Sequence, residues 1–179
     1  MGAEHTANLL GALALAIADQ SADAVGEASG QSMSDAAALS AMSHFLDGPS
    51  IDRLRQVLGL TPSGTVRLVD RLEDKGWVRR AAGVDARTTS LQLTPSGRRM
   101  AARVSQARAA LLAEALSPLT AAEQALLHEL VAKLLVGRMR GPGAVRWICR
   151  LCDTSACGRE RGECPVANEA TRRFSPDAG

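Results

Sequence analysis

Apolar side chains recur every three or four residues along most of the chain, which is the spacing of one face of an amphipathic helix. Polar helix-starting residues and glycines separate these stretches, so the pattern predicts a mainly helical protein. The predicted helices cover residues 5–28, 33–46, 51–58, 62–75, 95–116 and 121–138. Thr-Pro pairs begin two of them, at Thr61 and Thr94, because threonine is a good N-cap and proline suits the first helical position. Thr120 and Glu123 have the spacing of a capping box.

Two short helices, at residues 51–58 and 62–75, are separated by a turn that contains Gly59. Glycine adopts a positive φ just past a helix end without steric cost, and Gly76 ends the second helix in the same way. Two helices joined by a short turn with glycine form a helix-turn-helix, in which the second helix enters the major groove of DNA.

The second of these helices has an apolar side and a polar side. We expect the apolar residues to pack inside: Val66, Leu68, Val69 and Leu72. The candidate DNA-contacting residues are Ser63, Gly64, Thr65, Arg67 and Arg71. The two arginines are suited to guanine edges or to phosphates, and the sequence does not distinguish these targets. Taken alone, the polar side also fits the solvated face of an ordinary amphipathic helix.

Short β-prone runs on either side of a small-residue tip predict a hairpin between Trp77 and Thr94. Leu91 and Leu93 alternate with polar residues, so one face of the hairpin packs down. Three arginines remain outside as a basic wing: Arg79, Arg80 and Arg87. The predicted fold class is therefore mainly α with a small β-hairpin wing, a winged helix-turn-helix with long helices at both ends.

The chain resembles the MarR family of bacterial transcriptional regulators in three segments: residues 60–80, Asp85-Ala-Arg87 and Leu93-Thr-Pro-Ser-Gly97. The Asp-x-Arg followed by Leu-Thr-x-x-Gly separates this family from helix-turn-helix proteins in general, and the resemblance covers roughly residues 5–140. It implies that Arg87 enters the minor groove and that Asp85 helps to orient it. Asp85 also fits a turn residue that caps its own loop.

The resemblance also implies a homodimer that reads an inverted repeat in double-stranded DNA and responds to an unknown small-molecule effector. Long apolar-striped helices at both ends of the chain need a partner surface, and a two-fold dimer provides one; a bundle within one chain is the alternative. The same symmetry places two recognition helices about one DNA turn apart. The predicted units are a dimerisation helix (1–32), the winged helix-turn-helix (33–93), further dimerisation helices (94–140) and a cysteine-rich tail (141–179).

Charge is distributed unevenly although the net charge of the 179 residues is only +2. Counting Lys and Arg against Asp and Glu gives −6 for residues 1–49, +5 for residues 50–99 and +3 for residues 100–179. The positive segment coincides with the predicted helix-turn-helix and wing, as a phosphate-binding surface requires.

The apolar run from Leu9 to Ile17 is short and is followed by acidic residues. The start of the chain lacks a basic segment, so we expect no secretory leader, no membrane partner and a cytoplasmic protein. In a reducing compartment, cysteines are more often ligands or redox thiols than structural disulfides.

The tail holds the only four cysteines of the chain: Cys149, Cys152, Cys157 and Cys164. Two, four and six residues separate them, so one small loop can wrap them around a single ion or cluster. A Cys-x-x-Cys pair is the usual first half of a structural Zn²⁺ site, and a closing Cys-Pro occurs in iron-sulfur proteins. Reversible thiol oxidation without a cofactor and incidental thiols are the other interpretations.

These observations favour a sequence-specific transcriptional regulator, a repressor whose DNA binding responds to a small ligand, a metal or a redox signal. The alternative is a metal- or iron-sulfur-bearing redox protein or enzyme that uses the cysteines. The histidines are scattered and no catalytic constellation is visible, so we expect no enzyme activity. A tail that serves only assembly is a third hypothesis.

Overall fold

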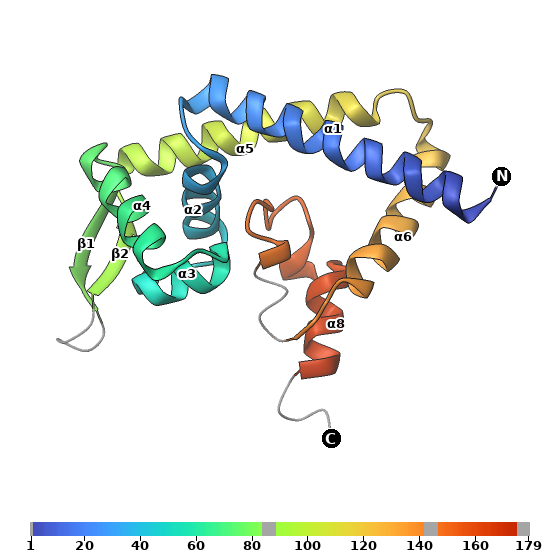
Figure 1. Cartoon of the computed structure of the whole chain (residues 1–179). Helices are drawn as coiled ribbons and strands as arrows, with labels where there is room; N and C mark the ends of the chain where they lie inside the picture. Colours follow the sequence, from blue (N-terminus) through green and yellow to red (C-terminus); the bar gives the residue numbers. More distant parts are fainter. Residues whose placement is uncertain (1, 84–88, 142–146, 175–179) are drawn as a thin grey trace.

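The computed structural model describes residues 2–83, 89–141 and 147–174, and shows a mainly helical chain with one antiparallel hairpin (Figure 1). In chain order the elements are α1 (Ala3–Ser29), α2 (Met33–His44), α3 (Ile51–Leu58), α4 (Pro62–Asp74), β1 (Val78–Ala82), β2 (Thr89–Leu93), α5 (Pro95–Leu116), α6 (Ala121–Gly137), a 3-10 turn (Arg159–Arg161) and α8 (Pro165–Phe174). The predicted fold class is confirmed, and the six predicted helices lie within a few residues of their expected bounds.

Local hydrogen bonds determine where the helices begin. The side-chain oxygen of each hydroxyl N-cap accepts a bond from the backbone NH three residues later; these caps are Ser32, Ser50, Thr61 and Thr94. Thr120 and Glu123 form the predicted reciprocal capping box. Gly59, at φ 66°, ends α3. Each bond satisfies a backbone group that the helix itself leaves free, so a few neighbouring residues are enough to start or stop these helices.

The reading head, as we name residues 33–93, is built around α2. Every residue of α2 from Asp35 to Met42 is buried, and this helix contacts α3, α4, β2 and α5. The largest fully buried leucines of the head come from four different elements: Leu39, Leu54, Leu68, Leu72 and Leu91. Burying a leucine side chain contributes about 1.5–3 kcal/mol, so these contacts hold the helix-turn-helix and the hairpin together.

The hairpin joins α5 through a very close backbone approach. Val78 faces Leu93 in the antiparallel register. A Cβ atom on Gly97 would lie 2.0 Å from the carbonyl oxygen of Trp77, so only glycine lets α5 start at this place. The backbone NH of Thr94 donates to the same carbonyl at 2.9 Å. The Leu-Thr-Pro-Ser-Gly string therefore fixes the wing to the long helix.

The long helices extend away from the head. α1 lies along α5, and α6 leads back toward the tail (Figure 1). Val25, Ala36 and Val104 form a small core where α1, α2 and α5 meet. Beyond it α1 and α6 expose large apolar side chains: Leu9, Leu10, Leu13, Leu15, Leu126, Leu130, Val131, Leu134 and Leu135. Within this single chain no residue of α6 is buried.

The apolar stretch of α1 is longer than the sequence pattern suggested. An 18-residue window of α1 has a mean hydropathy of 1.3 and is only 11% buried, so by length and composition this helix is apolar enough to cross a membrane. The apolar character of α1 therefore extends beyond the run from Leu9 to Ile17. Val25 packs in the core where α1, α2 and α5 meet, so the second half of α1 is attached to the protein fold.

The last described residues form a helix, α8, which continues to Phe174. Val166 is buried against the tail cluster, and Glu169 accepts hydrogen bonds from Arg172 and Arg173 one turn later. These pairs hold the pKa of Glu169 at about 2. Pairs at this spacing favour a helix, so they help to stabilise α8.

Candidate nucleic-acid interface and thiol cluster

The exposed face of α4 differs from the predicted one at two adjacent residues. Thr65 is fully buried, and its hydroxyl donates to the carbonyl oxygen of Thr61 at 3.0 Å. Val66 is 42% exposed. This corrects the placement expected from the sequence, because Thr65 continues the buried row that contains Leu68 and Leu72 at helical spacing. The helical spacing of Thr65 from Leu68 and Leu72 indicates that it is buried, although its side chain is polar.

The side chains that α4 presents to solvent near its start are Ser63, Val66 and Arg67, with Gly64 half-buried beside them. Thr61 caps this end by accepting a bond from the NH of Gly64 at 3.1 Å. A hydroxyl, a branched apolar group and a guanidinium suit the edges of a major groove, since an apolar side chain can contact a thymine methyl group. Val66 is thus a candidate contact that the sequence pattern missed.

Arg71 lies one turn further along α4 but is held by a buried carboxylate. Its Nη2 donates to Oδ1 of Asp35 at 2.7 Å. The Asp35 side chain is 4% exposed, whereas the Arg71 side chain is 48% exposed. This pair ties the recognition helix to α2, so the structure gives Arg71 a positioning role in the unbound protein.

The two arginines of β1 are also engaged within the head. Arg80 bonds to Asp70 on α4 at 2.6 Å and to Glu73, and the bond to Asp70 raises the pKa of Arg80. Arg79 donates to Gln92 on the facing strand. These contacts fix the orientation of the wing relative to the recognition helix. The predicted Asp85 and Arg87 lie outside the described residues.

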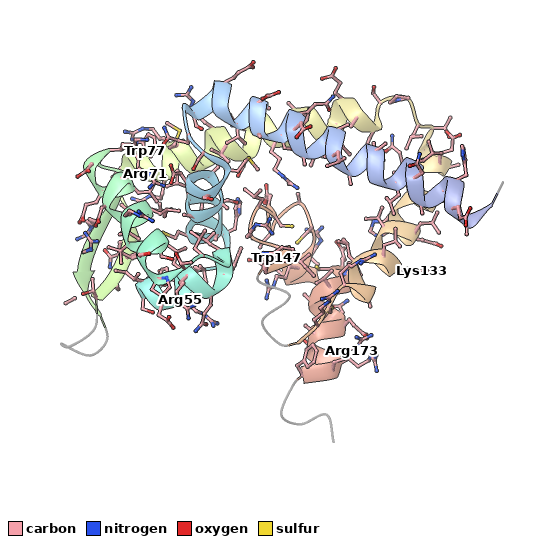
Figure 2. The ribbon with its side chains drawn as sticks, in the orientation of Figure 1. Arg55, Arg71, Trp77, Lys133, Trp147 and Arg173 are labelled. Carbon is pink, nitrogen blue, oxygen red and sulfur yellow. The ribbon has the colours of Figure 1, made fainter. Side chains whose placement is uncertain are left out.

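Arg67 differs from Arg71, Arg79 and Arg80 in its contacts. It is exposed, and among the ion pairs of the described ranges none includes its guanidinium. Figure 2 shows Arg71 and Trp77 on one part of the head and Arg55 on another, at the far end of the helix-turn-helix. Arg55 is paired with Asp52 at 2.7 Å. Arg67 is therefore the α4 arginine best placed to take a new anionic partner.

The four thiols of the tail come together in one small cluster. Cys149 and Cys164 are each 6% exposed and pack with Met139 and Val166, while Cys152 and Cys157 are half-buried at its edge. All four thiols line a cavity of about 520 Å³, whose other wall is α6. The sequence prediction that one loop gathers these cysteines agrees with this arrangement.

Tight turns shape the loop that carries the thiols. The NH of Cys152 donates to the carbonyl of Cys149 at 2.8 Å, which closes the Cys-x-x-Cys turn. Gly158 and Gly162 have φ of 65° and 70°. A Cβ on Gly158 would also lie 2.8 Å from the Cβ of Glu163. Both the positive φ and the lack of space therefore require glycine at position 158.

The thiols interact in pairs. A hydrogen bond with Cys149 lowers the pKa of Cys152 to about 6, and the positive charges of Arg108 and Arg159 act in the same direction. The same bond, together with burial, raises the pKa of Cys149. Burial also raises the pKa of Cys157. As the side chains stand, no three Cys, His, Asp or Glu residues of the described ranges are grouped as a ready metal-binding set.

Comparisons with known proteins agree with the architecture of the head and the long helices. The MarR family model matches residues 29–88. The apo form of wild-type MarR from E. coli is 26% identical, with a TM-score of 0.58 over 70% of this chain and 96% of that one. YusO from Bacillus subtilis is 24% identical, with a TM-score of 0.64 over 75% and 97%.

A third solved structure is MepR, a transcription regulator of the Staphylococcus aureus multidrug efflux pump MepA. It is 16% identical, with a TM-score of 0.65 over 74% of this chain and 98% of that one. No curated protein matches the chain. The helix-turn-helix and the wing thus agree with the MarR family model over residues 29–88, and the fold of the head and long helices resembles that of wild-type MarR from E. coli.

Proposed function

We propose that the protein works as a homodimer that binds an inverted repeat in double-stranded DNA through two reading heads. The observation that supports a dimer is the exposed apolar surface of α1 and α6. Leu126, Leu130 and Leu134 follow one another at four-residue spacing on α6, and each is 47–58% exposed. Soluble monomers rarely expose apolar patches of this kind, and a second copy of the same helices would cover them.

The DNA-binding surface that we propose combines the exposed start of α4 with the wing. Ser63, Val66 and Arg67 would face base edges in the major groove, and Arg87 would retain its predicted place in the minor groove. Arg71, Arg79 and Arg80 would act chiefly by holding α4 and the hairpin in the reading orientation. A protein with this role acts on the chromosome, so we also propose a cytoplasmic location.

The regulatory step that we propose is a change in the distance between the two heads. Two recognition helices fit one duplex only when they are about one helical turn apart. A small ligand, a metal or an oxidant that changes how α5 and α6 hold the heads would therefore change the affinity for the operator, which makes repression reversible.

The test is DNA binding by the full chain, measured by fluorescence anisotropy with the protein's own promoter region, alongside light scattering for the molecular mass. We expect a dimer that prefers the promoter to random DNA of the same length. Arg67→Ala should weaken specific binding about tenfold or more. The matched control is Arg172→Ala on α8, whose side chain is 70% exposed, and it should leave binding unchanged. A monomer without preference for its promoter would refute the proposal.

A further inference from the structure

We propose that Cys149, Cys152, Cys157 and Cys164 form a metal centre with four thiolate ligands, and that this centre couples metal occupancy to DNA binding. The second half of this inference rests on the proposed function. The shared chemistry is a centre held by four thiolates, which suits either one Zn²⁺ ion or an iron-sulfur cluster.

The fit of the donors is the first argument. All four thiols belong to a sixteen-residue stretch, point to one cavity of about 520 Å³ and share an apolar surround with Met139 and Val166. Cys149 and Cys152 stand at the two ends of one tight turn, which the bond from the NH of Cys152 to the carbonyl of Cys149 closes at 2.8 Å. Binding would form S–metal bonds, and each thiol that is still protonated would release its proton to water.

Charge around the thiols is the second argument. A metal centre with four thiolates carries net negative charge for both Zn²⁺ and a cluster. Arg108 from α5 donates to the carbonyl of Leu151, the residue before Cys152, at 3.3 Å, and Arg159 follows Cys157 by two residues in the loop. Cys152 and Cys157 also face Arg108 across a hollow of about 330 Å³. Positive groups from two elements would thus offset the charge of the loaded site.

The position of the loop in the fold is the argument for coupling, since residues beside the thiols contact the reading head. The hydroxyl of Thr154 donates to the carbonyl of His44, the last residue of α2, at 3.3 Å. Leu151 packs against the core of the head, and its carbonyl accepts a bond from Arg108 at 3.3 Å.

Trp147 makes a second contact with the head. Its indole ring lies over Gly59 in the turn between α3 and α4, with Nε1 3.5 Å from the place of a Cβ on that glycine. Figure 2 shows Trp147 beside α3, at the junction between the tail and the head. On the opposite side, the thiol cavity is closed by α6 residues such as His128 and Leu135.

The thiol loop thus lies between the DNA-reading head and a helix of the proposed dimer. Its own apolar core is too small to order it without a cross-link, and small metal-binding segments of this kind are unfolded without metal. Loss of metal would release Trp147 and Thr154 from the head. The heads would stay folded but would be held less firmly relative to α6, and fixing their spacing during DNA binding lowers affinity.

The first experiment measures metal in the full chain purified without oxygen, against a variant with all four cysteines changed to serine. Elemental analysis, acid-labile sulfide and the absorption spectrum identify the occupant. One colourless Zn²⁺ per chain, or iron with sulfide and visible absorption, supports the site. Metal no higher than in the serine variant, even after Zn²⁺ or iron and sulfide are supplied, overturns it.

The second experiment compares promoter binding by the wild-type protein before metal removal, after chelation and after metal is returned. This uses the native cysteines, so it does not depend on the folding of the serine variant. We expect depletion to weaken binding about tenfold and readdition to restore it. Unchanged affinity overturns the coupling.

Trp147→Ala tests the route of the coupling, with Phe174→Ala at the end of α8 as its aromatic control. Trp147→Ala should keep its metal but lose most of the difference in DNA affinity between loaded and depleted protein, whereas Phe174→Ala should keep that difference. An equal response in both variants overturns the Trp147 contact as the route. A chain that binds metal but no DNA in any state would refute the proposed function and leave the metal site standing.

Discussion

The reading head closes around five fully buried leucines from several elements. The small core of the described tail has two cysteines and Val166, packed with Met139 from the segment before it. The head therefore gains its stability from burial of aliphatic side chains between elements that pack on one another. The tail has little apolar area to bury, and segments of its length usually need metals or disulfides to hold a fixed fold. The two parts of the chain thus differ in how far burial of apolar side chains can stabilise them.

Metal removal should separate the two regions most strongly. We expect limited proteolysis of the chelator-treated protein to cut within residues 149–164, because the loop would lose the proposed metal cross-link. The reading head should stay protected and keep its thermal transition. Mass spectrometry of the fragments locates the cuts, and simultaneous cleavage of head and tail would contradict the difference between the regions.

A cavity in the head should cost the most among single substitutions. Leu72 is fully buried between α4 and the rest of the core, so Leu72→Ala should lower the free energy of unfolding by about 3–4 kcal/mol. Val66→Ala on the exposed side of the same helix is the control, with an expected change of about 0.5 kcal/mol or less. Urea denaturation followed by circular dichroism measures both; similar losses would mean that α4 packs by another face.

The backbone approach at Gly97 should be the next most sensitive point. Gly97→Ala places a Cβ 2.0 Å from the carbonyl oxygen of Trp77, so the wing and α5 must move apart, at a cost of about 2–3 kcal/mol. Gly26→Ala in α1 meets nothing within 4 Å and should be neutral or slightly stabilising. Thermal unfolding compares the two variants, and a harmless Gly97→Ala would show that the wing is less tightly fixed than the head core.

The smallest effect is expected at the ion pair between α4 and α2. Arg71→Ala leaves the buried carboxylate of Asp35 without its partner and should cost about 1–2 kcal/mol, a value reduced by the exposure of the arginine. The control is Arg55→Ala, because its partner Asp52 is exposed and the expected loss is about 0.5 kcal/mol or less. Double-mutant cycles with Asp35→Ala and Asp52→Ala measure the two pairs, and equal coupling would deny Arg71 its positioning role.

Much of the fold was predictable because its determinants are local. Helix starts at Thr61 and Thr94 need only a hydroxyl and an NH three residues away, and Gly59 needs only the freedom of its own φ. The hairpin and the segments that resemble the MarR family could also be recognised from the sequence. The apolar stripe of α6 was visible too, although a single chain leaves it uncovered.

The site was only partly predictable. From residue type we expected Thr65 on the exposed polar side of α4 and Val66 on the buried apolar side. In the structure Thr65 is buried and Val66 is exposed, as the helical spacing of the buried residues requires. Polarity is a property of one residue, whereas the buried row depends on how the whole helix lies against α2. The spacing of residues 65, 68, 69 and 72 contained this information.

By itself, the sequence determined where helices start and stop, that a basic winged helix-turn-helix follows an acidic start, and that four thiols share one short loop. Only the tertiary structure decided that Arg71 meets Asp35, that α8 folds back on α6, and that Trp147 rests on Gly59. Capping bonds and turns join residues within about four positions, so their chemistry can be recognised along the chain. Contacts between residues 36 or 88 positions apart depend on how whole elements pack, and no local pattern encodes that choice.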